Sequence, residues 1–173
     1  GLSNGVLDPQ IGRGTVTVTV TPVNDDPRVA NPLGTVTMSE DEAARVIDLS
    51  NVFFDPDVAL NSDALTYTVR GNSNTGLVLA TITGGQLTLQ LLPDQNGQST
   101  IVLEAKDLDG KTVTTQFTLQ VTAINDAPRL VVAIPDQVVA EDNGPVNLTL
   151  TPTYFFDPDV ISNSDQLSFS VVS

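Results

Sequence analysis

The 173-residue chain contains no cysteine, no histidine and no tryptophan. Without cysteine it has no disulfide and no thiol nucleophile, and without histidine it has no Ser-His or Cys-His arrangement and no ordinary zinc site. Any metal or ligand must therefore be bound by oxygen atoms. The lack of tryptophan also disfavours a stacking face for carbohydrate, because the tyrosines and phenylalanines mostly fall on the core-facing parity of the expected strands.

Positive charge is scarce as well, with 7 basic residues against 21 acidic ones and a formal net charge of −14. The cations are too few and too scattered to neutralise a phosphate backbone, so we expect no nucleic-acid partner. A surface this negative attracts divalent cations and repels itself in a compact chain. Adaptation of the surface to a saline medium is a simpler alternative explanation.

Long apolar runs are absent too. No stretch of eighteen or more apolar residues occurs, so we expect no membrane insertion through a spanning helix. The chain also begins and ends in the middle of a repeating pattern. It therefore resembles a piece of a longer polypeptide.

What the chain does have is an internal repeat. The run VNDDP at 23–27 returns 101 positions later as INDAP at 124–128, and FFDPD at 53–57 returns at 155–159. Each linker closes an alternating run and stops it with a proline, which has no N–H for a sheet ladder. We therefore predict a complete module at 27–126, between the end of a preceding module at 1–26 and the start of a following one at 127–173.

Alternation of apolar and polar residues predicts an all-β module. The run TVTVTVT at 15–21 has a strict period of two and is expected to be the last strand of the preceding module. Gly84-Gly85 indicates a tight hairpin turn, and Asp109-Gly110 another turn between strands. Seven short strands with turns between them indicate a β-sandwich, and we predict them at 34–38, 44–49, 64–70, 77–82, 86–91, 99–105 and 112–124.

The same alternation predicts which side chains face the core. No helix is expected, apart from a single turn that residues 40–45 could hold. The expected inward side chains are Ile47 and Leu49; Leu65, Tyr67 and Val69; Leu87, Leu89 and Leu91; Ile101, Leu103 and Ala105; and Phe117, Leu119 and Val121.

The acidic motifs between these strands are suited to calcium, which takes roughly six to eight oxygen ligands in irregular geometry. Asp55-Pro56-Asp57 in a loop points two carboxylates to one side, and the linkers offer amide and carboxylate oxygens together. Taken singly, Asp-Pro-Asp is more often a turn, and acidic runs are usually solvated faces. Repetition of the whole set favours a metal.

The motifs also follow a recognisable order. They are Glu40, the Asp-x-Asp pair at 55–57, Leu-Thr-Tyr at 65–67, Leu-Pro-Asp at 92–94, Ala-Lys-Asp at 105–107 and the linker before Pro128. This order resembles that of cadherins, and the run from 92 to 128 is similar to the VNDAP-type cadherin-like repeats of large bacterial surface adhesins. The resemblance implies tandem Ig-like, cadherin-like Greek-key β-sandwiches.

It also implies Ca²⁺ between consecutive modules. Leu92 stands where the family usually has a carboxylate, so one or two ions per junction are expected rather than three. At the first junction the implied ligands are Asn24, Asp25, the carbonyl of Asp26, Asp55, Asp57 and Asp107. At the second they are Glu40, Asp94, Asn125, Asp126, the carbonyl of Ala127, Asp157 and Asp159.

The function implied by the resemblance is mechanical and not enzymatic: a calcium-rigidified extender of a bacterial surface or secreted adhesin, located outside the cell and contacting neighbouring modules. The alternative is a module that binds polysaccharide or identical modules on another cell. An accessory domain of a secreted enzyme is a third interpretation, and a carboxylate pair acting as a glycosidase acid and base is disfavoured by its repetition at junctions. Strand 15–21 offers a route to head-to-tail association.

Overall fold

The computed structural model describes residues 15–60, 62–142, 144–150, 154–162 and 165–170. The first fourteen residues of the expected preceding module lie outside this description. The elements are β1 (Arg28–Val29), β2 (Val36–Ser39), β3 (Arg45–Asp48), β4 (Phe53–Phe54), α1 (Pro56–Leu60), β5 (Thr66–Asn72), β6 (Val78–Thr83), β7 (Gln86–Leu91), β8 (Gly97–Lys106), β9 (Thr112–Thr122), β10 (Arg129–Leu130), β11 (Phe155–Phe156) and α2 (Pro158–Ser162).

Two sheets form a sandwich. One has the strand order β2-β9-β8-β5 and the other β3-β7-β6. Strand β2 runs parallel to β9, whereas the other pairings in the two sheets are antiparallel. The long β8–β9 ladder, from Gly97 to Lys106 against Thr112 to Val121, is the spine of the larger sheet. The predicted all-β sandwich is thus confirmed.

All seven strands predicted for the complete module are present, and their ends differ from the prediction by at most two residues. Strands β1 and β4 were not predicted, because two-residue strands leave no alternation to detect. They pair Arg28 with Phe54 and Val29 with Phe53. Strands β10 and β11 repeat this pairing in the following segment.

The core lies between the sheets and follows the predicted parity. Leu49 and the inward residues of β7, β8 and β9 are buried, except for Leu91 at the end of β7. The other predicted inward residues are half-buried and pack against the core from its margin; they are Ile47, Leu65, Tyr67, Val69 and Leu91. The buried apolar side chains are Met38, Leu49, Val52, Phe53, Leu77, Val78, Leu87, Leu89, Ile101, Leu103, Ala105, Phe117, Leu119 and Val121.

Both predicted glycine turns are present. Gly84 and Gly85 have φ of 57° and 81° and join β6 to β7. A two-residue hairpin loop with positive φ at both positions matches the right-handed twist of the strands, and glycine adopts it without steric cost. Gly110, at φ 93°, serves the turn between β8 and β9 in the same way.

The prediction that residues 40–45 could hold a helical turn is wrong. Asp41 has φ 59°, so the chain turns sharply after β2, and Glu42 donates its backbone N–H to the Ser39 carbonyl at 3.2 Å. The short helices instead follow the two FFDPD motifs. Proline suits the first position of a helix, and aspartate suits the position before it, which is the sequence Asp-Pro that begins both α1 and α2.

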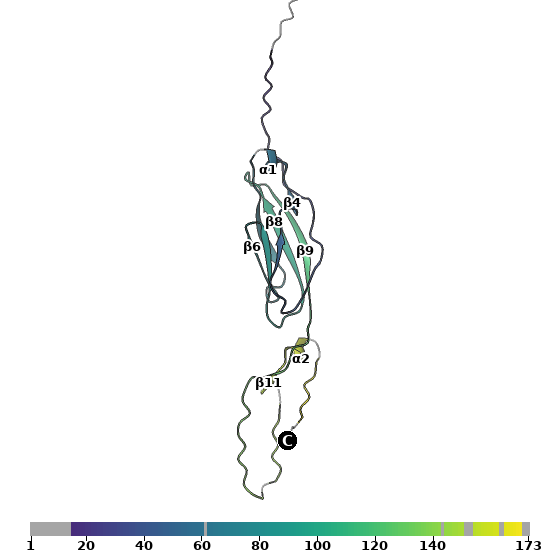
Figure 1. Cartoon of the computed structure of the whole chain (residues 1–173), viewed down its shortest axis with the longest axis vertical. Coiled ribbons are helices and arrows are strands. Elements are labelled where there is room, and N and C mark those ends of the chain that lie inside the picture. Colours follow the sequence, from purple (N-terminus) through teal and green to yellow (C-terminus); the bar gives the residue numbers. More distant parts are fainter. Residues whose placement is uncertain (1–14, 61, 143, 151–153, 163–164, 171–173) are drawn as a thin grey trace, which may run out of the picture.

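The strand predicted at 15–21 is not formed either. Its valines point into solvent, with Val16 85%, Val18 79% and Val20 84% exposed. A strand requires a hydrogen-bonding neighbour, and the described residues supply none for this segment. Figure 1 shows it as an extended tail leaving the sandwich beside α1.

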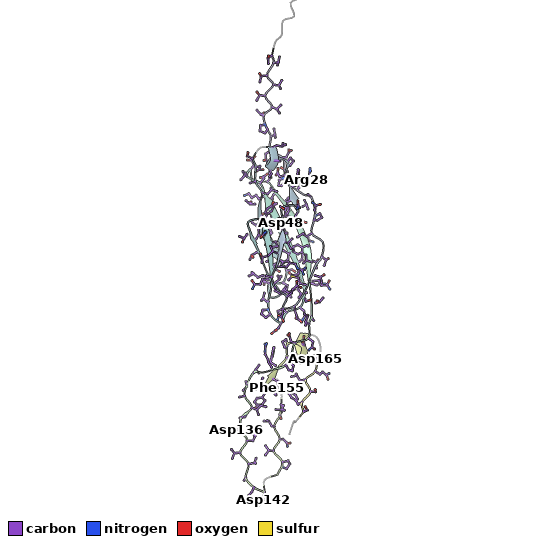
Figure 2. The ribbon with its side chains drawn as sticks, in the orientation of Figure 1. Arg28, Asp48, Asp136, Asp142, Phe155 and Asp165 are labelled. Atoms are coloured by element: carbon purple, nitrogen blue, oxygen red, sulfur yellow. The ribbon has the colours of Figure 1, made fainter. Side chains whose placement is uncertain are left out.

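The two acidic linkers lie at opposite ends of the sandwich. Helix α1 is at the end where residues 15–27 enter, and α2 lies beyond the other end, where the chain leaves β9 (Figure 1). In the following segment Asp142, the repeat of Asp41, is at the tip farthest from the sandwich (Figure 2). None of the helices in the described part of the chain has the length and apolar character needed to cross a membrane.

Candidate metal centre

The Asp-Pro-Asp motifs build the same scaffold twice. Asp57 donates its backbone N–H to Asp55 Oδ1 at 2.8 Å, which caps α1, and Asp159 does the same to Asp157 Oδ1 at 2.9 Å at the start of α2. The side chains of Asp55 and Asp57 are both only 3% exposed. Buried carboxylates at one end of a sandwich need hydrogen-bond or cation partners to offset their lost hydration.

Each linker supplies one such partner. The backbone N–H of Asp25 donates to Asp57 Oδ2 at 2.6 Å, and that of Asp126 donates to Asp159 Oδ2 at 2.5 Å. Each linker is therefore hydrogen-bonded to the acidic motif that follows it. The two junctions have this hydrogen bond in common.

At the first junction, oxygens of Asp55, Asp63 and Asp107 all lie within 4.8 Å of one another. Asp107 directly follows strand β8, and its Oδ1 accepts the backbone N–H of Lys111 at 2.7 Å. Its Oδ2 accepts Nδ2 of Asn24 from the linker at 3.0 Å. Among the described residues, Asp55 Oδ2 and Asp63 Oδ2 are buried and have no hydrogen-bond partner. Two buried oxygens without a hydrogen-bond partner thus belong to residues of one cluster.

The carboxyl groups of Asp55 and Asp107 have opposite pKa shifts. Burial raises the pKa of Asp55, and the neighbouring charges of Asp63, Asp57 and Asp107 add to this, outweighing the N–H of Asp57 that lowers it. Burial also raises the pKa of Asp107. Hydrogen bonds, of which that from Asn24 has the largest effect, lower the pKa by more, so that it is below its ordinary value.

At the second junction, oxygens of Glu40, Asp126 and Asp159 lie within 4.8 Å of one another. Glu40 follows strand β2 and is only 2% exposed. Its Oε1 accepts the backbone N–H of Ile124, and its Oε2 accepts Nδ2 of Asn96 at 3.2 Å. Residues from the complete module, the linker and the following segment thus meet at one point.

A second cluster, made by Asp41, Asp94 and Asp126, shares Asp126 with the first. Asp41 and Asp94 sit in sharp turns with φ of 59° and 55°, and Asp94 donates its backbone N–H to Asp41 Oδ1 at 3.1 Å. Asp126 Oδ2 is buried with no hydrogen-bond partner among the described residues. Burial raises the pKa of Asp126, and Asp41, Asp94, Asp159 and Glu40 raise it further through their charges.

The structure brings some of the predicted ligands together and not others. The predicted ligands that belong to the clusters are Glu40, Asp55, Asp94, Asp107, Asp126 and Asp159. Asn24 donates a hydrogen bond to one of them, Asp107.

The other predicted ligands have different partners. Asp25 is hydrogen-bonded to Asp57, and Asp157 caps α2. Asp26 pairs with Lys111 Nζ at 3.2 Å, while Nδ2 of the exposed Asn125 donates to the carbonyl of Asp126 at 2.9 Å. Ala127 is exposed, and a ligand role for its carbonyl and that of Asp26 stays a prediction.

Two cluster members, Asp63 and Asp41, were not predicted. The signal for Asp63 is its place six residues after Asp57, which Asp165 repeats six residues after Asp159. Both positions also repeat the same hydrogen bond, from the Asp63 N–H to the Asp57 carbonyl at 3.3 Å and from Asp165 to Asp159 at 3.2 Å. Figure 2 shows Asp165 close to the second junction.

The clusters consist of carboxylates, which bind hard divalent cations in preference to soft ones.

Comparison with known proteins identifies the family to which the chain belongs. The model of the bacterial Ig domain matches residues 24–120, which is more than half of the chain. The chain belongs to the bacterial Ig domain family. The match begins at Asn24, in the first linker, and ends before the second.

The bacterial Ig domain also has distant likenesses among solved structures. Protocadherin gamma B7 extracellular domains 1–4 align at 21% identity and a TM-score of 0.44, covering 68% of this chain and 29% of that one. The human desmocollin-1 ectodomain aligns at 24% identity and a TM-score of 0.42, covering 64% of this chain and 21% of that one. An endo-fucoidan hydrolase of glycoside hydrolase family 107 aligns at 17% identity and a TM-score of 0.41, covering 61% of this chain and 15% of that one.

These TM-scores are below 0.5, so nothing about function follows from them. The bacterial Ig domain spans less than a third of each of these three structures. A search of curated proteins found no significant match.

Proposed function

We propose that this bacterial Ig domain is a calcium-rigidified spacer of a large surface or secreted adhesin, of the VNDAP-type cadherin-like kind, and that it works outside the cell. The observation that carries the proposal is the pair of matching acidic junctions at opposite ends of one sandwich. Asp55 Oδ2, Asp63 Oδ2 and Asp126 Oδ2 are buried there without hydrogen-bond partners among the described residues.

The first junction fits calcium by its chemistry. Asp55, Asp63 and Asp107 would provide carboxylate oxygens, and a cation would offset the burial and the neighbouring negative charges that raise the pKa of Asp55. Asn24 now directs its amide nitrogen at Asp107. Because the two ends of an amide are nearly alike in shape, turning the Asn24 side chain would offer an oxygen ligand instead.

The second junction fits in the same way, and it offers more carboxylates. Glu40 and Asp159 would hold one ion together with Asp126, while Asp41 and Asp94 extend the site on the other side of Asp126. Two clusters that share one carboxylate would give room for one or two ions. The magnesium ion is a poorer fit, because it prefers a rigid octahedron and retains its water.

Calcium bound in this way would act on the linkers. Asn125 and Asp126 lie in the linker, and a single ion held by Glu40, Asp126 and Asp159 would connect the module, the linker and the next module. Extracellular calcium modules bind with dissociation constants of about 10⁻⁴ to 10⁻³ M. A chain of such modules would therefore be stiff outside the cell and would hold a terminal binding domain away from its surface.

Carbohydrate binding through a sheet face has less support. Such faces stack sugar rings on exposed aromatic side chains, but here Phe54 lies under the Arg28 guanidinium, 4.6 Å from the ring centroid. Phe53 and Phe117 are buried, and the ring of Tyr67 packs against that of Phe53 with their centroids 5.6 Å apart. No flat aromatic platform is present on the described part of the sandwich.

Calcium titration by calorimetry, combined with thermal melting, tests the proposal. We expect saturable calcium binding, a higher melting temperature in calcium than in chelator, and a much smaller rise with magnesium. Asp55→Asn should reduce this rise, whereas Asp136→Asn, at an exposed position outside the clusters, should leave it unchanged. A melting temperature that is the same in calcium and chelator would refute the proposal.

A further inference from the structure

Arg129 connects the two sides of the second junction. It lies in β10, just after the linker, and its guanidinium carbon is 4.9 Å from the centroid of the Phe156 ring in β11. Its NH2 nitrogen is 3.3 Å from Oδ2 of Asp94, which belongs to the turn between β7 and β8 of the complete module. The planar guanidinium is thus supported on one face by the following segment and paired with an acid of the preceding module.

This ion pair enters an acidic cluster. Asp94 shares its cluster with Asp41 and Asp126, and Asp126 also belongs to the cluster of Glu40 and Asp159. Among the described residues, Arg129 is the one cation whose side chain forms a salt bridge with any of these five carboxylates. Asp94 is 27% exposed and Arg129 58% exposed, so the pair is partly shielded from solvent.

The repeat provides a matched comparison. Arg28 occupies the equivalent position after the first linker and stacks on Phe54 in the same way, at 4.6 Å. Figure 2 shows Arg28 near the opposite end of the sandwich from the second junction. No salt bridge of Arg28 to a described carboxylate is formed. Within the described residues the two arginines therefore differ in the acidic partner and share the aromatic support.

We propose that Arg129, supported by Phe156, is the built-in counter-cation of the cluster formed by Asp41, Asp94 and Asp126, and stands in for a second metal ion there. Its charge has two opposite effects. Without a bound metal it attracts Asp94 and holds the two sides of the junction together. With calcium in the neighbouring cluster, the same positive charge repels the ion and lowers its affinity.

The two effects separate this role from a merely structural one. Loss of a side chain that only packs the interface would loosen the junction and also weaken calcium binding. Loss of a counter-cation loosens the metal-free junction and strengthens calcium binding. The inference about calcium rests on the proposed function, whereas the inference about the metal-free junction does not.

The test compares Arg129→Gln with Arg28→Gln, which makes the same change of charge. Because the chain has no cysteine, Val46→Cys and Val138→Cys allow spin labels at two exposed positions on either side of the second junction. Distances between the labels, measured in chelator by pulsed electron resonance, should spread over a wider range in Arg129→Gln than in the unchanged protein. Arg28→Gln should keep the original distribution.

Calcium affinity is then measured by calorimetry in an Asp63→Asn background, which weakens the first junction so that the second dominates. We expect Arg129→Gln to bind calcium about threefold to tenfold more tightly, from the removal of one charge at short range in partly screened solvent. Arg129→Lys keeps the charge and should restore the original affinity. Arg28→Gln should have no effect on it.

Weaker or unchanged calcium binding in Arg129→Gln would overturn the counter-cation, as would an unchanged distance distribution in chelator. If the unchanged protein bound no calcium at all, the proposed function would fail. The distances in chelator would still decide whether Arg129 holds the metal-free junction. The two failures are therefore distinguishable.

Discussion

The backbone N–H of Asp126 donates to Oδ2 of Asp159 at 2.5 Å, across 33 residues of sequence. Asp25 and Asp57 make the same bond at 2.6 Å at the other end of the sandwich. Each linker is therefore hydrogen-bonded to the acidic motif that follows it. The second cluster also includes Glu40 of the sandwich.

The shared carboxylate of the second junction is the most sensitive position. Asp126→Asn keeps the size of the side chain but removes a charge from both clusters, so calcium binding there should weaken by roughly tenfold or more. The first junction should be unaffected. Calorimetric titration should therefore lose the second-junction sites and retain those at the first; equal weakening at both would contradict the assignment.

Asp63 should be a ligand although its sequence neighbourhood did not single it out. Asp63→Asn should weaken calcium binding at the first junction by roughly tenfold, because Asp63 Oδ2 is one of two orphaned oxygens in that cluster. Asp109→Asn is the matched control, since Asp109 is an exposed acid of the neighbouring turn outside the clusters. If both variants behaved alike, overall charge and not the cluster would explain the result.

Acid should stabilise the calcium-free protein through Asp55. Burial and neighbouring carboxylates raise the pKa of Asp55 in the folded state above its unfolded value. The protonated form therefore contributes stability that is fully present below the unfolded pKa and is lost as the pH rises through the folded pKa. Melting in chelator should show a gain on mild acidification that is smaller in Asp55→Asn. An equal gain in both proteins would assign it to general charge repulsion.

The core should be independent of the metal. Leu103 is fully buried in β8, and Leu103→Ala should lower the free energy of unfolding by about 2–5 kcal/mol through lost apolar burial and the cavity left behind. Urea denaturation should give the same loss in calcium and in chelator. A loss confined to one condition would mean that the sandwich and its junctions do not act as separate units.

The sandwich could be predicted because its strands carry a strict period of two. Ile101, Leu103 and Ala105 alternate with outward residues, and the predicted inward parity is the buried one. The helices α1 and α2 escaped prediction because five residues show no helical period. Their signal is local, an aspartate that caps and a proline that begins the helix.

The acidic site could be predicted only in part. Glu40, Asp55 and Asp126 stand in motifs that repeat 101 or 102 positions apart, whereas Asp63 and Asp41 resemble ordinary turn residues until the fold brings them beside the others. Strand 15–21 has the pattern of a strand but no neighbour with which to pair. Sequence alternation specifies which face of a strand is apolar and cannot supply the partner.

Small-angle X-ray scattering of the whole chain in calcium and in chelator tests the central claim most directly. If calcium fixes the junctions, the curve in millimolar calcium should fit one extended arrangement, and the curve in chelator should require a mixture of bent and straight forms. Asp126→Asn in calcium should resemble the chelated protein. Identical curves in calcium and chelator would contradict the calcium joint.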